Sequence, residues 1–171
     1  MKNKIVPFSV FFFFIFIFFV FYKSLNQTNI YTPNVNLNKN IPEFEAKIFK
    51  SNERFSSKDF ILNEYYLINI WASWCAPCQI EHKYLMKLNK IKKLNLIGIN
   101  YKDSKSNADN FLKNLGNPYD IILIDEDGKL SINWGAYGVP ETFLIFNNKI
   151  KKKYTGPLDE TSVQEIEKIF N

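Results

Sequence analysis

The chain reads YLINIWASWCAPC from Tyr66 to Cys78, which joins a short apolar run to a pair of cysteines. Residues 66–71 are apolar and rich in β-forming side chains, so they predict a buried strand that ends at Ala72. From Cys78 onward the apolar residues fall at helical spacing with charges between them, which predicts an amphipathic helix over residues 76–92. The two cysteines therefore stand where a strand turns into a helix.

Further strands and helices alternate along the rest of the chain. Short apolar runs predict strands at residues 96–100, 121–124, 142–146 and 150–154, with a turn at 125–128 and a hairpin at Asn147-Asn148. Capping residues predict one helix from Ser104 or Ser106 through Leu115, and a last helix that begins at overlapping capping boxes on Thr161 and Ser162. This order indicates an α/β fold with a sheet of mixed direction.

The two cysteines indicate thiol–disulfide chemistry. A thiolate, not a thiol, attacks a disulfide, and the first turn of a helix offers unpaired N–H groups and the positive end of the dipole. Pro77 suits this turn, because the N–H group that proline lacks is not needed there. We expect Cys75 to attack and Cys78, one turn along, to resolve the mixed disulfide, so that Cys75–Cys78 is a redox-active disulfide.

Three other interpretations of the cysteine pair are weaker. A structural disulfide across two residues closes a very short loop and stabilises little. A zinc site needs two more ligands, and His82 is the single histidine of the chain. Covalent haem attachment needs a CxxCH motif, whereas Gln79 follows Cys78. We therefore expect no metal at the site.

Composition argues against two other function classes. The six glycines form neither of the common phosphate-binding motifs, so no nucleotide cofactor is expected. The net charge is +5, but Arg54 is the single arginine among 22 basic residues, and bidentate recognition of phosphate or guanine favours arginine. The lysines of residues 149–153 alternate with Ile150 as on a solvated strand. A nucleic-acid partner is not expected.

The first 22 residues predict a membrane anchor. Residues 5–22 hold no charged side chain, and 18 residues of helix span about 27 Å, close to the thickness of the hydrocarbon core. Lys2 and Lys4 come before this run, so the positive-inside rule places the N-terminus in the cytoplasm and the rest of the chain across the membrane. A cleaved signal peptide is the alternative, although no small-x-small cleavage site follows the run.

The remaining chain divides into a linker and one domain. Residues 23–42 hold six asparagines, two prolines and no acid, which predicts a flexible tether. Residues 43–171 are then one folded domain, long enough to bury a core without disulfide or metal support.

A family resemblance lies in strings along this domain. WASWCAPC (71–78), with Gly138-Val-Pro140 and the hairpin after it, resembles the thioredoxin family. The strings GINYKD (98–103), GNPY (116–119), DEDG (125–128), WGAYGVPETF (134–143) and GP (156–157) occur in this order. They resemble the membrane-anchored thiol–disulfide oxidoreductases of cytochrome c maturation, the CcmG/DsbE type within the wider ResA/TlpA-like group. The resemblance runs from about Ile41 to Pro157 and implies a thioredoxin-like mixed sheet flanked by helices.

The resemblance also implies roles for residues around the cysteines. Pro140 is expected in cis beside the disulfide, where it presents backbone to a substrate strand. Thioredoxin has a buried acid six residues before its first cysteine, but Asn69 stands there and cannot take a proton from Cys78.

Glu81, one turn after Cys78, and Glu141, directly after Pro140, are expected to line the site instead. Negative charge there would oppose thiolate formation, and ordinary solvated carboxylates are the alternative for both. Trp74 is expected to shield the disulfide and Trp71 to belong to the core. His82 is expected at the surface.

The function that the resemblance implies is that of a reductant held in the inner membrane and facing the periplasm. Reduced Cys75 would attack a disulfide at the CxxCH segment of apocytochrome c, Cys78 would release the freed thiols, and a membrane thiol–disulfide donor would supply electrons. A general thiol reductase for other clients, an apocytochrome-binding holdase and a DsbA-like oxidase are the alternatives, because motif residues do not fix a reduction potential.

Overall fold

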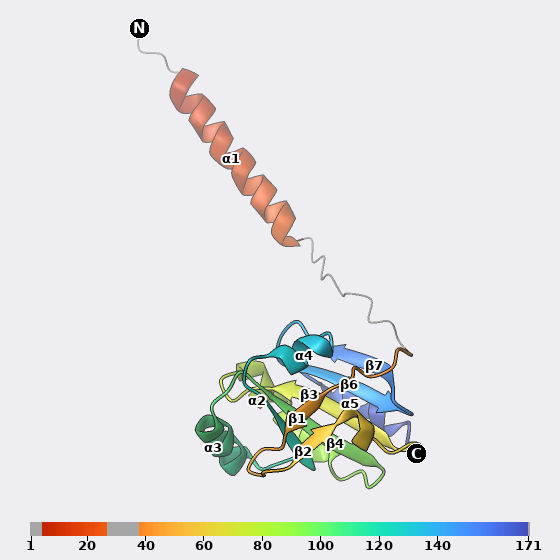
Figure 1. The fold of residues 1–171 in the computed structure, drawn as a ribbon. Helices are drawn as coiled ribbons and strands as arrows, with labels where there is room; N and C mark the ends of the chain where they lie inside the picture. The colour runs from red at the N-terminus through yellow and green to blue at the C-terminus, as the bar shows by residue number, and fades with distance from the viewer. Residues whose placement is uncertain (1–4, 27–37, 171) are drawn as a thin grey trace. The chain divides into compact units, whose positions relative to one another are not determined.

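A computed structural model describes residues 5–26 and 38–170, which belong to two separate units. The first unit contains helix α1 (Ile5–Asn26), which includes the apolar run and continues beyond the expected end at Tyr22 (Figure 1). The side chains of α1 are described from Phe8 to Lys23, and nearly all are exposed. Within the described residues, no helix has both the length and the apolar character needed to cross a membrane. The part of the expected tether at residues 27–37 lies outside the described residues.

The second unit is built on a five-stranded mixed sheet. Its strands are β3 (Tyr65–Trp71), β4 (Leu94–Tyr101), β5 (Ile121–Asp125), β6 (Glu141–Phe146) and β7 (Lys149–Thr155). They lie in the order β5-β4-β3-β6-β7, with β3, β4 and β5 parallel and β6 and β7 antiparallel to their neighbours (Figure 1). The mixed sheet predicted from the sequence is confirmed.

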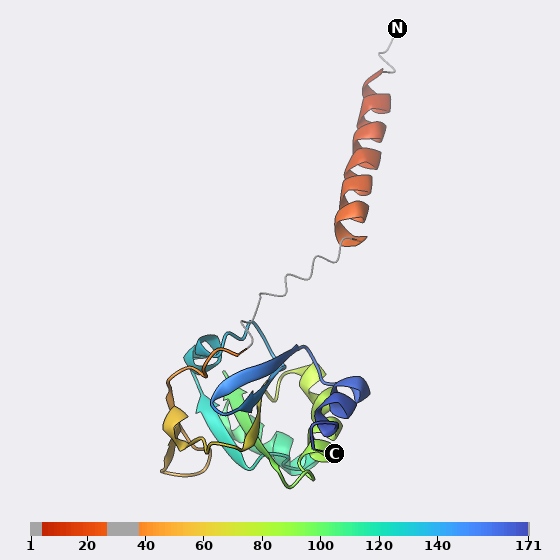
Figure 2. The ribbon, with the colours of Figure 1, turned by 90° about the vertical axis from the view of Figure 1, so that its right-hand side faces the viewer.

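Two layers cover the two faces of this sheet (Figure 2). Helices α2 (Ala76–Leu88), α3 (Lys105–Leu115) and α5 (Glu160–Glu167) pack on one face, together with Leu67 and Trp71 of β3. The other face packs against the short helix α4 (Lys129–Asn133) and the hairpin of β1 (Glu45–Lys47) and β2 (Arg54–Ser56), which leads into the 3-10 turn η1 (Ser57–Asp59). Ile68 and Ile70 of β3 face this second layer. Alternate residues of one strand thus serve two cores, as the two-residue period of a strand requires.

Several element boundaries differ from the predictions. Helix α2 ends at Leu88 with Asn89 as its C-cap, short of the expected residue 92. The last helix is capped by Asp159 and not by Thr161 or Ser162, because the Asp159 carboxylate accepts hydrogen bonds from the N–H and the hydroxyl of Ser162, at 2.8 and 2.7 Å. Elements β1, β2, η1 and α4 were not predicted, since runs of three to five residues carry no measurable period.

The predicted hairpin turn is present between β6 and β7. Asn147 and Asn148 have φ values of 53° and 56°, the positive values that a two-residue hairpin of this kind requires. The chain before β1 lies against this hairpin: the Asn38 N–H donates to the Ile150 carbonyl at 2.8 Å, and the Ile41 N–H to the Asn148 carbonyl at 2.9 Å. The last residues of the range expected to be a tether are therefore part of the folded domain.

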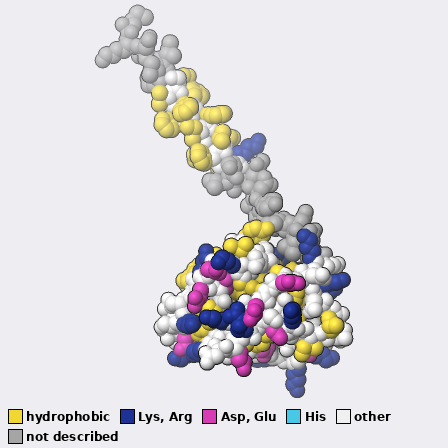
Figure 3. Space-filling model, in the orientation of Figure 1, with side chains coloured by type: hydrophobic (Ala, Val, Ile, Leu, Met, Phe, Trp, Pro, Cys, Tyr) yellow, Lys and Arg dark blue, Asp and Glu magenta, His cyan; other side chains and the backbone are white. Residues whose placement is uncertain are grey.

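Charges of both signs lie interspersed on the face of the domain seen in Figure 3. Elsewhere in the domain, Lys87 forms ion pairs with Glu160 and Glu167 at the surface. Such pairs contribute little to stability.

Candidate active site

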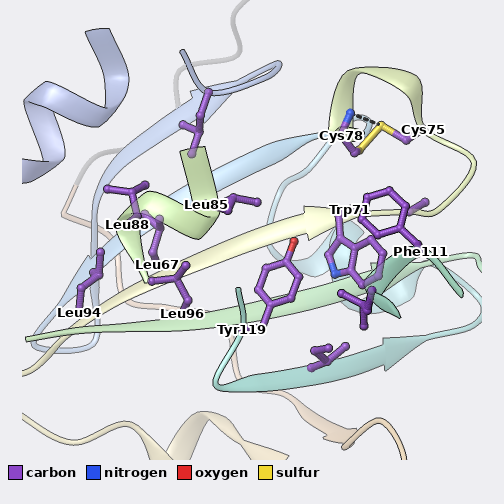
Figure 4. Packing of buried hydrophobic residues seen from close by; sticks show 14 of the residues in the cluster. Leu67, Trp71, Cys75, Cys78, Leu85, Leu88, Leu94, Leu96, Phe111 and Tyr119 are labelled. Carbon is purple, nitrogen blue, oxygen red and sulfur yellow. Dashed lines mark hydrogen bonds between the residues drawn. A yellow bond between two sulfur atoms is a disulfide. The ribbon is translucent and has the colours of Figure 1, made fainter. Parts of the chain in front are cut away.

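The two cysteines begin helix α2 at the carboxyl end of the central strand. Cys75 is the N-cap in extended conformation, and its Sγ accepts a hydrogen bond from the Cys78 N–H at 3.1 Å (Figure 4). Pro77 lies in the first turn, as expected. The sulfurs form a disulfide with an S–S distance of 2.05 Å and a Cα–Cα distance of 5.3 Å, so the structure shows the oxidised state. In this state the residues are only 4% and 2% exposed.

The loop before Cys75 is held by the loop that follows β4. Asp103 accepts hydrogen bonds from the N–H and the hydroxyl of Ser73, at 2.6 and 2.8 Å. The indole N–H of Trp74 donates to the Lys102 carbonyl at 3.0 Å. Trp74 itself is 58% exposed, and its expected role as a shield of the disulfide stays a prediction. Sequence reasoning did not find Asp103, although it belongs to one of the strings that carried the resemblance.

The Val139–Pro140 peptide bond is cis, as the resemblance implied. Val139 packs against the core cluster that contains both cysteines, and Pro140 is buried. The Pro140 carbonyl accepts a hydrogen bond from the Gly156 N–H at 3.1 Å. The cis-proline segment and the cysteine pair are therefore parts of one packed region.

Glu81 is fully buried on helix α2, so the solvated-carboxylate alternative is wrong for it. Its Oε1 accepts a hydrogen bond from Asn69 Nδ2 and its Oε2 accepts one from the Leu158 N–H, both at 2.8 Å. Burial raises the pKa of Glu81 to about 7, and the two hydrogen bonds partly oppose that rise. A carboxyl that titrates near neutral pH is suited to proton transfer.

Asn69 is the centre of a buried hydrogen-bond network. Its Nδ2 donates to Thr142 Oγ1 at 2.9 Å as well as to Glu81, and its Oδ1 accepts from the Tyr119 hydroxyl at 2.7 Å. Asn69 cannot take a proton, as the sequence indicated, but it holds the residue that can. Burial raises the pKa of Tyr119 well above its usual value, so this hydroxyl stays a donor. Sequence reasoning missed Tyr119, which the fold brings to β3 from beyond α3.

Glu141 is also buried, but its charge is paired. Its Oε2 lies 2.5 Å from Lys153 Nζ, with side chains only 2% and 4% exposed, and its Oε1 accepts a hydrogen bond from the Tyr137 N–H at 2.9 Å. The solvated-carboxylate alternative is therefore wrong here too. The expectation that the lysines of residues 149–153 lie on a solvated strand is wrong for Lys153.

His82 is buried, contrary to the surface position expected for it. Its Nε2 donates to the Gly116 carbonyl at 3.0 Å, and its ring lies edge-on to Phe111 with the centroids 5.2 Å apart. Burial lowers the pKa of His82, so the neutral ring is favoured. This side chain joins α2 to the end of α3. Trp71, by contrast, belongs to the core as expected, stacked on Tyr119 at 5.6 Å.

Neither a metal site nor a further thiol is evident around these residues. Within residues 5–26 and 38–170, no group of three or more His, Cys, Asp and Glu side chains is placed to hold a metal ion. The described residues hold one cysteine pair, with a buried acid one helical turn beyond Cys78.

Comparison with known proteins supports the same chemistry. The redoxin family model matches residues 36–170. The chain is 34% identical over 171 residues to the thiol:disulfide interchange protein DsbE of Allochromatium vinosum, covering 98% of this chain and 92% of the relative. It is 48% identical over 100 residues to the thiol:disulfide interchange protein CycY of Rhizobium leguminosarum, covering 58% of this chain and 54% of that one.

A solved structure supports the fold. The crystal structure of a protein described as a putative thiol:disulfide interchange protein DsbE from Chlorobium tepidum aligns with a TM-score of 0.65, covering 78% of this chain and 94% of that one. The sequence identity of that pair is 21%, so the likeness concerns the fold alone.

Proposed function

The chain belongs to the redoxin family as a DsbE-type thiol–disulfide oxidoreductase, and from this we propose that it reduces disulfides of apocytochrome c before haem attachment. The observation that carries the proposal is the Cys75–Cys78 pair at the N-terminus of α2, beside the cis-Pro140 segment. The client would be the CxxCH segment of apocytochrome c, oxidised to an intramolecular disulfide.

The exchange takes two steps. In the reduced protein the Cys75 thiolate attacks one client sulfur, which forms a mixed disulfide and releases the other client sulfur as a thiolate. The Cys78 thiolate then attacks the Cys75 sulfur, which frees the second client thiolate and leaves the Cys75–Cys78 disulfide seen in the structure. Two electrons pass to the client, and a membrane thiol–disulfide donor would restore the dithiol.

The start of helix α2 would favour the Cys75 thiolate, and the buried acid would accept the proton of Cys78. The Cys78 N–H that bonds to Cys75 Sγ, together with the helix dipole, favours a negative charge on that sulfur. Cys78 must lose a proton before it can resolve the mixed disulfide. We assign Glu81 as the acceptor, because it lies one turn along α2 and its pKa is raised to about 7.

A trapping experiment tests the client. The Cys78→Ser variant should accumulate a mixed disulfide between Cys75 and apocytochrome c in cells that produce cytochrome c, while Cys75→Ser should accumulate none. Mass spectrometry of the trapped species separates the proposal from a general thiol reductase, which would capture other clients instead. The Cys75→Ala, Cys78→Ala double variant tests a holdase, since a holdase would keep cytochrome c production without either thiol.

The direction of electron flow is part of the proposal. The full-length reduced protein should convert an oxidised CxxCH peptide to its dithiol form, measured by mass spectrometry after alkylation. A redox titration against glutathione then gives the reduction potential. A protein that instead oxidised the reduced peptide would be an oxidase, and the reductive proposal would be wrong.

We further propose that residues 5–22 anchor the chain in the inner membrane, with the N-terminus cytoplasmic and the domain in the periplasm. This rests on the uncharged run within α1 and on the two lysines before it. The alignment with the Allochromatium relative covers 98% of this chain, so it includes most of the leader. The chain should stay in the membrane fraction after alkaline washing with Met1 or Lys2 as its N-terminus. A mature N-terminus near residue 25 would show a cleaved signal peptide.

A further inference from the structure

Lys153 is the one lysine of the 149–153 cluster that the sheet holds inside the protein. Its Nζ pairs with Glu141 at 2.5 Å and donates to the Gly135 carbonyl at 2.8 Å. The same amino group lies over the rings of Tyr137 and Phe143, 4.7 and 5.3 Å from their centroids. Every contact of this charge is thus with β6 or with the loop before cis-Pro140.

These contacts flank the cis-Pro140 segment, which joins them to the region of the cysteine pair. Glu141 directly follows Pro140 and pairs in register with Ile70 of β3, near the end of the strand that leads to Cys75. Val139, two residues before Glu141, packs against both core clusters, so it links the cluster that contains Phe143 and Ile70 to the cluster that contains both cysteines. Charges in such a buried region interact more strongly than they would in water.

The pair changes the electrostatic role of Glu141. Alone, a buried carboxylate here would oppose the Cys75 thiolate, and an unpaired ammonium would favour it. Together, the two charges cancel at a distance, while Glu81 remains a buried acid whose described partners are uncharged. Lys153 therefore decides whether the region beside the cis-proline is neutral or negative.

We propose that Lys153 is a positioning residue of the dithiol site: by pairing with Glu141 it cancels a negative charge that would slow Cys75, and it holds the loop of residues 135–137 before cis-Pro140. The inference rests on the proposed thiol chemistry and adds to it a residue from β7 that the resemblance did not indicate. It acts through Glu141 and not on the client.

A purely structural role and an electrostatic role predict different patterns. If the pair only supported the fold, removal of either partner would disturb the site in the same direction. If the charges act on Cys75, the two single substitutions have opposite effects on its reactivity, and the double substitution restores it.

The experiment measures alkylation of Cys75 by iodoacetamide. The full chain is used in a Cys78→Ala background, so that Cys75 is its single thiol. Rates are compared at each pH from 6 to 9 for Lys153→Met, Glu141→Gln and the double variant. We expect Lys153→Met to slow the reaction about three- to tenfold at the acid end, where the fraction of Cys75 present as thiolate limits the rate. Glu141→Gln should speed it by a similar factor at the acid end, and the double variant should stay within about twofold.

Lys152→Met is the matched control. It removes the same charge from the neighbouring position of β7, where Lys152 pairs with Glu165 and the two side chains are 40% and 47% exposed. Its alkylation rate should match that of the parent protein at every pH.

The outcomes separate the two proposals. A parent protein whose Cys75 reacts no faster than a free cysteine thiol would overturn the proposed thiol function itself. A reactive parent with single variants that shift in the same direction, or with a double variant that stays shifted, would overturn only the role of Lys153. Circular dichroism checks that each variant folds. If Lys153→Met does not fold, acceleration in Glu141→Gln and its loss in the double variant decide the question.

Discussion

The Tyr119 hydroxyl donates a hydrogen bond to Asn69 Oδ1 at 2.7 Å, joining residues 50 positions apart in the sequence. Because its oxygen is occupied, the Asn69 amide can turn only its NH2 group toward Glu81 and Thr142. Tyr119 thus determines which end of the amide faces the buried acid.

Removal of that hydroxyl should weaken the network without opening the core. In Tyr119→Phe the ring still stacks on Trp71, while the Asn69 oxygen loses its donor. We expect a loss of about 1 kcal/mol in the free energy of unfolding, measured by urea denaturation. Tyr137→Phe, at an exposed position, should change it by less than about 0.5 kcal/mol. Equal effects of the two substitutions would contradict the role of the Tyr119 hydroxyl.

Glu81 should make stability depend on pH. Its pKa is raised to about 7 from 4.5, so between these values the folded state binds more protons than the unfolded state. The contribution of Glu81 to stability is therefore full below about pH 4.5 and is lost as pH rises through 7. We expect a fall of about 2–3 kcal/mol between pH 5 and 8 that is absent in Glu81→Gln. Urea denaturation of both proteins at the two pH values measures it, and parallel pH profiles would refute it.

The Lys153–Glu141 pair should show strong coupling in stability. Removal of one partner leaves a buried charge without compensation and should cost about 3–5 kcal/mol in Lys153→Met or Glu141→Gln. The double variant should lose less than the sum of the single variants by at least about 1 kcal/mol. A double-mutant cycle from urea denaturation gives the coupling energy. Additive losses would show that the two side chains act independently.

Gly98 should tolerate no side chain. A Cβ at this position of β4 would lie 2.8 Å from Trp71 Nε1 and 3.0 Å from the Tyr119 ring. Gly98→Ala should therefore destabilise the protein by about 1–3 kcal/mol through overpacking. Gly138→Ala is the control, because a Cβ there would meet no atom within 4 Å. Thermal unfolding of both variants checks this, and similar melting temperatures would count against the close approach.

Local patterns in the sequence were enough to predict the central strands and the cysteine pair. Residues 66–71 are buried along the whole strand and form an apolar run that only Asn69 interrupts, and the helix after Cys78 shows its own period. The cis-Pro140 came from the resemblance and not from any local pattern. The sequence alone could not predict the hydrogen bond between Asn69 and Tyr119, because this contact forms only when β3 and the loop before β5 meet in the fold.

Lys153 shows why the sequence did not predict which side chains of residues 149–153 are buried. Strict alternation from the buried Ile150 would turn residue 152 inward and residue 153 outward. The ladder instead has an irregularity between Leu144 and Ile145, where Ile145 pairs with Ile150 but Leu144 pairs with Lys152. The extra residue in β7 reverses the alternation, so that Lys153 comes opposite the buried Phe143. Nothing in the run of lysines marks this bulge.

The chain between residues 38 and 49 has a consequence for solubility. Its first part bonds to β7 and its last part to β5, where the Phe49 N–H donates to the Ile122 carbonyl at 2.8 Å. These are the two outermost strands of the sheet, whose open backbone groups would otherwise offer templates for a second copy. One short segment thus covers both edge strands and hinders self-association. A fragment that started at residue 43 would leave the edge of β7 uncovered.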